Sequence, residues 1–260
     1  MSETICSFYD PLAEHYHLIF DDWDRAIARQ AQILAPLLQS EISAGPLKIL
    51  DCACGIGTQA IGLAQRGHHL VGSDLSPSMI GRARREATLR SLDIAFHTAD
   101  MTSLRGVGSG FDAAVALDNA LPHLDAHQLT QAAQTIASRL IPGGLFLASI
   151  RDYDRLTLER PAIQTPAFYG DAGDRRIVHQ VWDWIDDTRY TVHLHIALES
   201  QGTWQSHHFV SEYRCLLREE LSVALTSAGF TGIRWLMPSE SGFYQPLVVA
   251  RHAGEALLES

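Results

Sequence analysis

The feature that most constrains the fold is a short turn with two glycines, at 54–57, between a strand-like and a helix-like segment. Leu47–Leu50 is a short apolar run, and Thr58–Gln65 has the pattern of a helix. A second apolar run, His69–Gly72, follows and leads to Asp74. Strands that alternate with helices form parallel sheets with helices on both faces, and such sheets bind ligands at the carboxyl ends of their strands. The sequence therefore predicts a doubly wound α/β fold with a ligand site beside this turn.

The alternation continues to about residue 150. It predicts further helices at Trp23–Leu38, Pro77–Arg90 and Asp125–Leu140, and further strands at Ile94–His97, Asp112–Leu117 and Leu145–Ile150. Beyond Arg151 the pattern becomes strand-like with few helix formers, at 177–184, 190–198 and 208–217. We interpret this region as an antiparallel β cap inserted after the fifth strand. A helix at Glu219–Ala228 and a hairpin of Ile233–Met237 with Leu247–Ala250 then complete a mostly parallel seven-stranded sheet.

These elements divide the chain into four parts. We expect N-terminal lid helices at 1–44, a ligand-binding core at 45–152, an antiparallel substrate cap at 153–215, and a return to the core at 216–260.

Charge and composition narrow the classes of partner. The chain has 20 Lys and Arg against 30 Asp and Glu, a formal net charge of −10, which disfavours nucleic acid and anionic membranes as partners. No apolar run approaches the ~20 residues that cross a bilayer, and the first ten residues lack the pattern of a secretory signal. The four cysteines form no CxxC pair, and the 13 histidines lack metal-site spacing with cysteine. We therefore predict a cytoplasmic protein with a small-molecule substrate and no metal, and leave its oligomeric state open.

The glycine turn and its flanking acids favour a cationic ligand. Gly55 and Gly57 let the backbone approach a ligand closely, and an acid at the position of Asp74 can accept both hydroxyls of a ribose. Asp51 ends the first strand, where a carboxylate would repel a pyrophosphate but attract the sulfonium and ammonium groups of S-adenosylmethionine. A nicotinamide-dependent oxidoreductase, the competing interpretation, rests only on the two glycines and Ala60.

In these residues the sequence resembles the class I S-adenosylmethionine-dependent methyltransferases. The resemblance covers Ile49–Gly57, with Ala53 where a glycine is usual, Val71–Ser76, Thr98–Met101, Phe111–Asn119 and Ile141–Leu145. It implies a Rossmann-like fold with S-adenosylmethionine as cofactor. The expected cofactor residues in and beside these segments are Asp51, Ala53, Gly55, Gly57, Asp74, Leu75, Met79, Asp100, Met101 and Leu117. Tyr16 and Arg29, with Arg25 as the alternative to Arg29, are added as cofactor residues by a narrower resemblance, to a group in which an N-terminal aromatic segment with an arginine covers the methionine end of the cofactor.

Within that class the chain resembles the glycine/sarcosine N-methyltransferase group and related small-molecule methyltransferases. The similarity lies in the aromatic segment Tyr9–Trp23 and in Arg151-Asp152-Tyr153-Asp154, whose arginine in that group holds the substrate carboxylate. It implies in-line methyl transfer to a nitrogen of a glycine-like amine or a nitrogen heterocycle. The expected catalytic residues are Asn119, Arg151, His123 and His17, and the expected substrate-binding residues are Tyr9, Asn119, Arg151, Trp182 and Tyr244.

Two alternatives stay open. One is O-methylation of a natural-product intermediate, and the other is a non-catalytic protein that binds S-adenosylmethionine. The base that would take a proton from an amine is also open among His17, His123 and Asp152.

Overall fold

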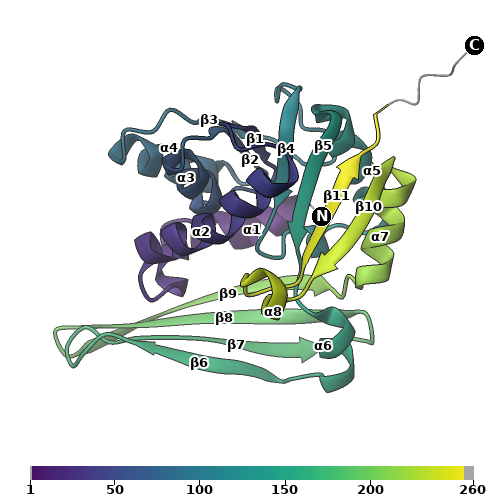
Figure 1. Ribbon diagram of the computed structural model, residues 1–260. Helices are drawn as coiled ribbons and strands as arrows, with labels where there is room; N and C mark the ends of the chain where they lie inside the picture. The colour runs from purple at the N-terminus through teal and green to yellow at the C-terminus, as the bar shows by residue number, and fades with distance from the viewer. Residues whose placement is uncertain (1, 255–260) are drawn as a thin grey trace, which may run out of the picture.

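The computed structural model describes residues 2–254, and a seven-stranded sheet forms its centre (Figure 1). Neighbouring strands follow the order β10-β11-β5-β4-β1-β2-β3. The strands from β3 to β5 in that order run parallel, whereas β11 is antiparallel to β5 and β10 to β11. The bounds are β1 (Lys48–Asp51), β2 (His69–Asp74), β3 (Ala95–Thr98), β4 (Phe111–Ala116), β5 (Leu140–Ser149), β10 (Phe230–Leu236) and β11 (Leu247–His252). The predicted mostly parallel seven-stranded sheet is confirmed.

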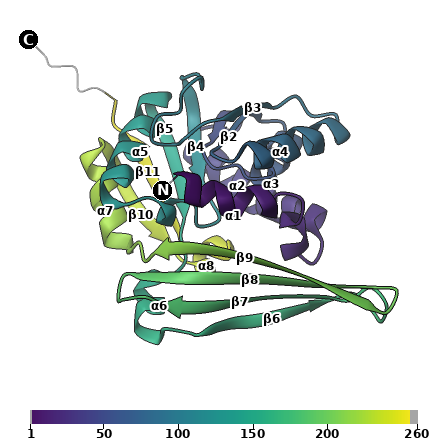
Figure 2. The ribbon, with the colours of Figure 1, turned by 180° about the vertical axis from the view of Figure 1, so that it is seen from behind.

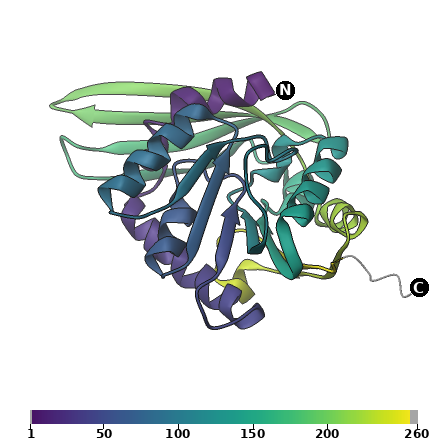
Figure 3. The ribbon, with the colours of Figure 1, turned by 90° about the horizontal axis from the view of Figure 1, so that it is seen from above.

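Helices cover both faces of this sheet, as Figure 3 shows from above. Successive residues of one strand point to opposite faces, so Ile49 of β1 packs with α2, α3 and α4, and Leu50 packs with α5 and α7. The helix bounds are α2 (Trp23–Glu41), α3 (Thr58–Gln65), α4 (Pro77–Leu89), α5 (Ala126–Arg139) and α7 (Arg218–Ser227). The strand order reverses between β1 and β4, which places the glycine turn after β1 at the switch point where such sheets bind ligands.

A second, antiparallel sheet of four strands follows the fifth strand of the core, in the order β6-β7-β8-β9. Its strands are β6 (Ile163–Tyr169), β7 (Arg176–Trp184), β8 (Arg189–Ser200) and β9 (Thr203–Arg214). Along β8 the residues at every second position, from Tyr190 to Ile196, are buried. This alternation identifies the face that packs against the rest of the molecule. The inserted antiparallel cap is confirmed.

The structure differs from the sequence-based expectation at several connections. The cap has a fourth strand, β6, preceded by a short helix, α6 (Tyr153–Glu159). The sequence did not predict β6 because this strand is largely exposed and contains a proline, so it lacks the alternation of a half-buried strand. The turn at Pro142–Gly144 belongs to β5, where the pairing with β4 shifts register, and a short helix, α8 (Pro238–Ser241), lies inside the predicted hairpin.

The N-terminal segment lies against the core and the cap together. It consists of α1 (Ser2–Leu12), the 3-10 helix η1 (Tyr16–Ile19) and α2. Helix α1 packs between α4 and β9, which Figure 2 shows from behind. The division of the chain at residues 44, 152 and 215 remains a prediction.

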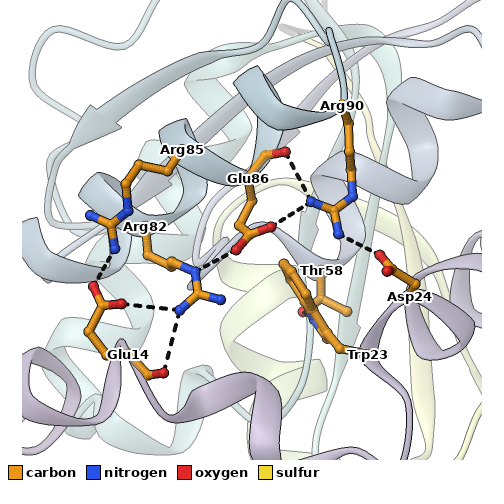
Figure 4. Close-up of polar contacts among 8 residues, drawn as sticks. All are labelled: Glu14, Trp23, Asp24, Thr58, Arg82, Arg85, Glu86 and Arg90. Atoms are coloured by element: carbon orange, nitrogen blue, oxygen red, sulfur yellow. Dashed lines mark hydrogen bonds and ion pairs between the residues drawn. The ribbon is translucent and has the colours of Figure 1, made fainter.

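Charged side chains form ion pairs between this N-terminal segment and α4 (Figure 4). Glu14 forms ion pairs with Arg82, at 3.2 Å, and with Arg85. Arg82 also contacts Glu86 at 2.6 Å, and both side chains are largely buried. Burial alone would raise the pKa of Glu86, but hydrogen bonds from Arg90 and Arg82 outweigh it and lower that pKa. The network therefore ties the segment over the ligand site to the helix that follows Asp74.

Among residues 2–254, no helix combines the length and the apolar character needed to cross a bilayer.

Candidate functional site

A first cavity opens at the carboxyl ends of β1, β2 and β4, beneath α1. It is lined by backbone and side chains of the glycine turn, by the residues that follow β2 and β3, and by α1. Eight of the residues predicted to bind a cofactor line it: Tyr16, Ala53, Gly55, Asp74, Leu75, Asp100, Met101 and Leu117.

The glycine turn has the backbone conformation that only glycine adopts without strain. Gly55 has φ +52° and Gly57 has φ +97°, both in the left-handed region. Gly57 is the N-cap of α3, so it starts that helix rather than lining the cavity. A Cβ on Gly55 would meet no atom within 4 Å, although Gly55 itself lines the cavity. The space over Gly55 is therefore open to a ligand.

We expect Gly55→Ala to weaken binding of S-adenosylhomocysteine by roughly tenfold and to lower the free energy of unfolding by about 1–2 kcal/mol, since an L-residue is strained in the left-handed region. Isothermal titration calorimetry and thermal melting measure the two effects. Gly45→Ala is the matched control, because Gly45 has no neighbour within 4 Å of its Cβ and no left-handed φ. Equal affinity in the Gly55 variant would contradict a close approach of the ligand.

Asp74 holds the turn and the next helix together. Its Oδ2 accepts a hydrogen bond from the backbone N–H of Gly55 at 2.9 Å, and its Oδ1 accepts one from Ser76 at 2.9 Å. Burial raises the pKa of Asp74 despite these two bonds. Each oxygen keeps a free lone pair, so the carboxylate can also accept hydroxyls of a ligand in the cavity.

Asp51, at the end of β1, is buried and lies behind the cavity lining. Its Oδ2 has no hydrogen-bond partner, and burial raises its pKa to about 8. A buried carboxylate with an unsatisfied oxygen is stabilised by a nearby positive charge.

The charges around the first cavity are of one sign. Asp74, Asp100 and Asp118 line it, and within the described part of the chain no lysine or arginine does. Such a cavity attracts a cationic ligand and repels a pyrophosphate, which argues against a nicotinamide dinucleotide.

A second, larger cavity of about 1030 Å³ adjoins the first and reaches the cap. Tyr9, Tyr16 and Asp118 line both cavities, so these residues mark their junction. The predicted substrate residues Trp182 and Tyr244 line the second cavity.

The Arg151 guanidinium lies in this second cavity and is held by neutral groups. It donates to the Tyr190 hydroxyl at 2.7 Å and to Gln180 Oε1 at 3.1 Å, and it lies 4.7 Å from the centre of the Trp182 ring. The centre of the Tyr213 ring lies 5.3 Å from the same guanidinium carbon. These contacts fix the position of the charge without neutralising it.

The carboxylates next to Arg151 in sequence pair with another arginine. Asp152 contacts Arg218 at 2.7 Å, and Asp154 contacts Arg218 at 3.3 Å. Among the ion pairs of residues 2–254, Arg151 takes part in none. Its charge is therefore available to an anionic group of a ligand.

Asn119 connects the ends of β4 and β5. Its Oδ1 accepts from the backbone N–H of Arg151 at 2.9 Å, and its Nδ2 donates to the Tyr153 hydroxyl at 3.0 Å. Through these two bonds Asn119 links the backbone at Arg151 to the Tyr153 hydroxyl, and it also lines the second cavity.

His123 lies beside Tyr9 in the first cavity. The Tyr9 hydroxyl is 2.9 Å from His123 Nε2 and 3.3 Å from the Tyr213 hydroxyl. Burial, with the charge of Arg151, lowers the pKa of His123 to about 3. The imidazole is therefore neutral at physiological pH and is a poor proton acceptor.

Three predicted residues lie elsewhere. Met79 is fully buried in the core, and Arg29 is exposed and lines the second cavity but not the first. His17 lines neither cavity; it lies in η1 towards Arg82 and Glu86, and burial lowers its pKa. This placement does not support a catalytic role for His17.

Several site residues have no signal in a single sequence. Gln59, Gln180 and Tyr190 reach the cavities or hold their charged groups from α3, β7 and β8. Only the pairing of β7 with β8 brings the last two to Arg151.

Comparison with known proteins agrees with this geometry. A family model described as methyltransferase domain matches residues 49–144. The glycine N-methyltransferase of Rattus norvegicus is 33% identical over 140 residues, covering 49% of this chain and 48% of that protein. The glycine/sarcosine N-methyltransferase of Parasynechococcus marenigrum is 31% identical over 137 residues, covering 52% of this chain and 48% of that protein. Residues 49–144 are a methyltransferase domain, which supports the resemblance to the class I S-adenosylmethionine-dependent methyltransferases.

A further sequence relative and two solved structures are also similar. The 2-heptyl-1-hydroxyquinolin-4(1H)-one methyltransferase of Mycobacteroides abscessus is 29% identical over 160 residues, covering 61% of this chain and 66% of that protein. The sugar N-methyltransferase of a Streptoalloteichus species has a TM-score of 0.72 at 21% identity, covering 87% of each chain. An amino pentose methyltransferase of Micromonospora echinaspora has a TM-score of 0.71 at 20% identity, covering 87% of this chain and 91% of that one. The matches span about half the length of the glycine methyltransferases, 48% of each.

The comparisons support S-adenosylmethionine as the cofactor, and the first cavity fits it. The unsatisfied oxygen of Asp51, the open space over Gly55 and the acidic lining all suit a cationic nucleoside. Asp74 would hold the ribose hydroxyls, and Asp100 and Met101, which line the same cavity, would contact the adenine.

Proposed function

We propose that the protein transfers a methyl group from S-adenosylmethionine to a nitrogen of a small molecule. The observation that carries this proposal is the junction of the two cavities. The first cavity has the residues for the cofactor, and the second has room and an unpaired guanidinium for an acceptor. An acceptor in the second cavity meets the cofactor beside Tyr9, Tyr16 and Asp118.

The charge of Arg151 supports an acceptor with a carboxylate. A guanidinium binds a carboxylate through two parallel hydrogen bonds, and the neutral groups around Arg151 leave its charge uncompensated. The names of the relatives, glycine N-methyltransferase and glycine/sarcosine N-methyltransferase, support an amino acid amine as acceptor.

A hydroxylated heterocycle is the second candidate. The second cavity, at about 1030 Å³, is larger than glycine requires, and the Trp182 ring in its wall suits a planar acceptor. The relative from Mycobacteroides abscessus is named as a methyltransferase of a hydroxyquinolone.

In this proposal the chain aligns the acceptor and excludes water. The bound cofactor supplies an electrophilic methyl group on a sulfonium, whose departure as a thioether needs no proton. Arg151 orients the acceptor, and the aromatic side chains of Tyr9 and Tyr16 cover the junction. His123 stays neutral and keeps the Tyr9 hydroxyl in place. A biosynthetic role in the cytoplasm is part of the same proposal.

We expect binding of S-adenosylhomocysteine and no binding of NAD in calorimetric titrations, because the acidic first cavity repels a pyrophosphate. NAD binding without S-adenosylhomocysteine binding would contradict the cofactor assignment.

Activity is measured as formation of S-adenosylhomocysteine with glycine, sarcosine, glucosamine and 2-heptyl-1-hydroxyquinolin-4(1H)-one as acceptors. Product from an amine supports the proposal. Product only from the hydroxyquinolone supports the second candidate, and tight cofactor binding without product from any acceptor supports a non-catalytic binding protein.

A further inference from the structure

One carboxylate stands where the two cavities meet. Asp118 follows β4 and lines both cavities. Its Oδ1 accepts a hydrogen bond from the Tyr244 hydroxyl, and its Oδ2 accepts one from Gln59 Nε2 at 2.7 Å. Tyr244 lines the second cavity and Gln59 the first, so each oxygen is held from a different side.

The backbone fixes this carboxylate at the junction. Asp118 has φ +55° and Asn119 has φ +68°, two consecutive non-glycine residues in the left-handed region. Such strain is uncommon and persists where the surrounding structure enforces it. The Asp118 N–H donates to Ser149 Oγ at 2.8 Å, and the Asn119 N–H donates to the Ser149 carbonyl at 3.3 Å, so β5 holds both residues.

The charge of Asp118 has no protein partner. Asp118 takes part in none of the ion pairs formed by residues 2–254, and its two hydrogen-bond donors are a phenol and an amide. Burial raises its pKa, although the bonds from Tyr244 and Gln59 oppose the shift. A carboxylate accepts about four hydrogen bonds and here accepts two, so both oxygens can bind a further donor.

We propose that Asp118 binds the ammonium group of the acceptor at the junction and receives its proton. This inference rests on the proposed nitrogen methylation and adds the residue that recognises and deprotonates the amine. The N–H bond breaks, its electron pair stays on nitrogen as the attacking lone pair, and the proton passes to Asp118 and then to solvent. With Arg151 at the other end of the acceptor, the site selects a molecule that carries both an ammonium and an anionic group.

The raised pKa of Asp118 suits the removal of a proton from an ammonium group. A carboxylate with an ordinary pKa is a weak base, and partial burial makes Asp118 a stronger one. His123, whose pKa is lowered, and Asp152, which is paired with Arg218, are weaker acceptors for the same proton.

The test measures binding of methylammonium chloride by ligand-observed NMR, with S-adenosylhomocysteine saturating the first cavity. We expect Asp118→Asn to weaken methylammonium binding at least tenfold. Asp118→Gly should do the same, and it keeps the fold because glycine adopts the left-handed backbone without strain. The matched control is Glu159→Gln, which removes an exposed carboxylate that lines the second cavity and pairs with Arg155.

Three results overturn the inference: no methylammonium binding to the wild-type protein, equal binding by the Asp118 variants, or equal loss in Glu159→Gln. A tenfold loss of S-adenosylhomocysteine affinity in the Asp118 variants, with methylammonium binding retained, also overturns it and assigns the carboxylate to the cofactor. Failure of every amine in the acceptor assay contradicts the proposed function separately, because the binding measurement requires no turnover.

Discussion

Asp74→Ala is expected to weaken S-adenosylhomocysteine binding by about 100- to 10,000-fold, because two charge-assisted hydrogen bonds to ribose hydroxyls are worth roughly 1.5–3 kcal/mol each. Titration calorimetry at constant pH measures the dissociation constant. Undiminished affinity would show that Asp74 does not hold the ribose.

The structure adds a stability effect to this substitution. Alanine also removes the acceptors for the N–H groups of Gly55 and Ser76, which leaves the glycine turn and the start of α4 without that support. We therefore expect a lower melting temperature together with the lost affinity. Asp74→Asn separates the two effects, because its amide oxygen keeps one acceptor while the charge is lost. A variant that melts like the wild type and binds weakly assigns the loss to the ligand.

The cofactor side of the site could be predicted from sequence because its residues are local. Asp74 is the last residue of β2 and Gly55 lies in the turn that follows β1, and parallel strands bring their carboxyl ends to one edge of the sheet. The seven-stranded sheet could be predicted for the same reason, since its strands and helices alternate with clear hydrophobic periods.

The acceptor side could not be predicted in the same way. Arg151 stands out in the sequence, but its partners Gln180 and Tyr190 lie on two strands of the cap whose register a single sequence does not specify. Asp118 illustrates a second limit. Its importance lies in lining two cavities and in lacking a basic partner, and neither property belongs to a local pattern.

The direction of the His17 side chain could not be predicted from the sequence. His17 is one of three residues that the sequence offers as a candidate base, with His123 and Asp152. In the structure η1 turns His17 towards Arg82 and Glu86, while Tyr16, one residue earlier, lines both cavities. The direction of a side chain in a single turn of helix depends on packing that the sequence pattern does not contain.

Arg151→Lys is expected to lower kcat/KM for a carboxylate-bearing acceptor by about 10- to 100-fold, since one lost charge-assisted hydrogen bond is worth roughly 1.5–3 kcal/mol. The lysine ammonium cannot reproduce the planar two-point contact with a carboxylate. The substitution also removes the guanidinium that donates hydrogen bonds to Tyr190 and Gln180. The affinity for S-adenosylhomocysteine should stay within about twofold, because Arg151 lines only the second cavity.

The matched control for this substitution is Arg155→Lys, which changes an exposed arginine that lines the same cavity and pairs with Glu159. Steady-state kinetics with sarcosine and with 2-heptyl-1-hydroxyquinolin-4(1H)-one divide the acceptor classes. A large loss with sarcosine and a small one with the hydroxyquinolone is the expected result for a carboxylate site. For a neutral heterocycle, replacements of Trp182 or Tyr244 should instead have the larger effect, because these side chains form the wall of the cavity. Unchanged kinetics with a lower melting temperature would show that Arg151 serves only to pack Trp182 and Tyr213 together.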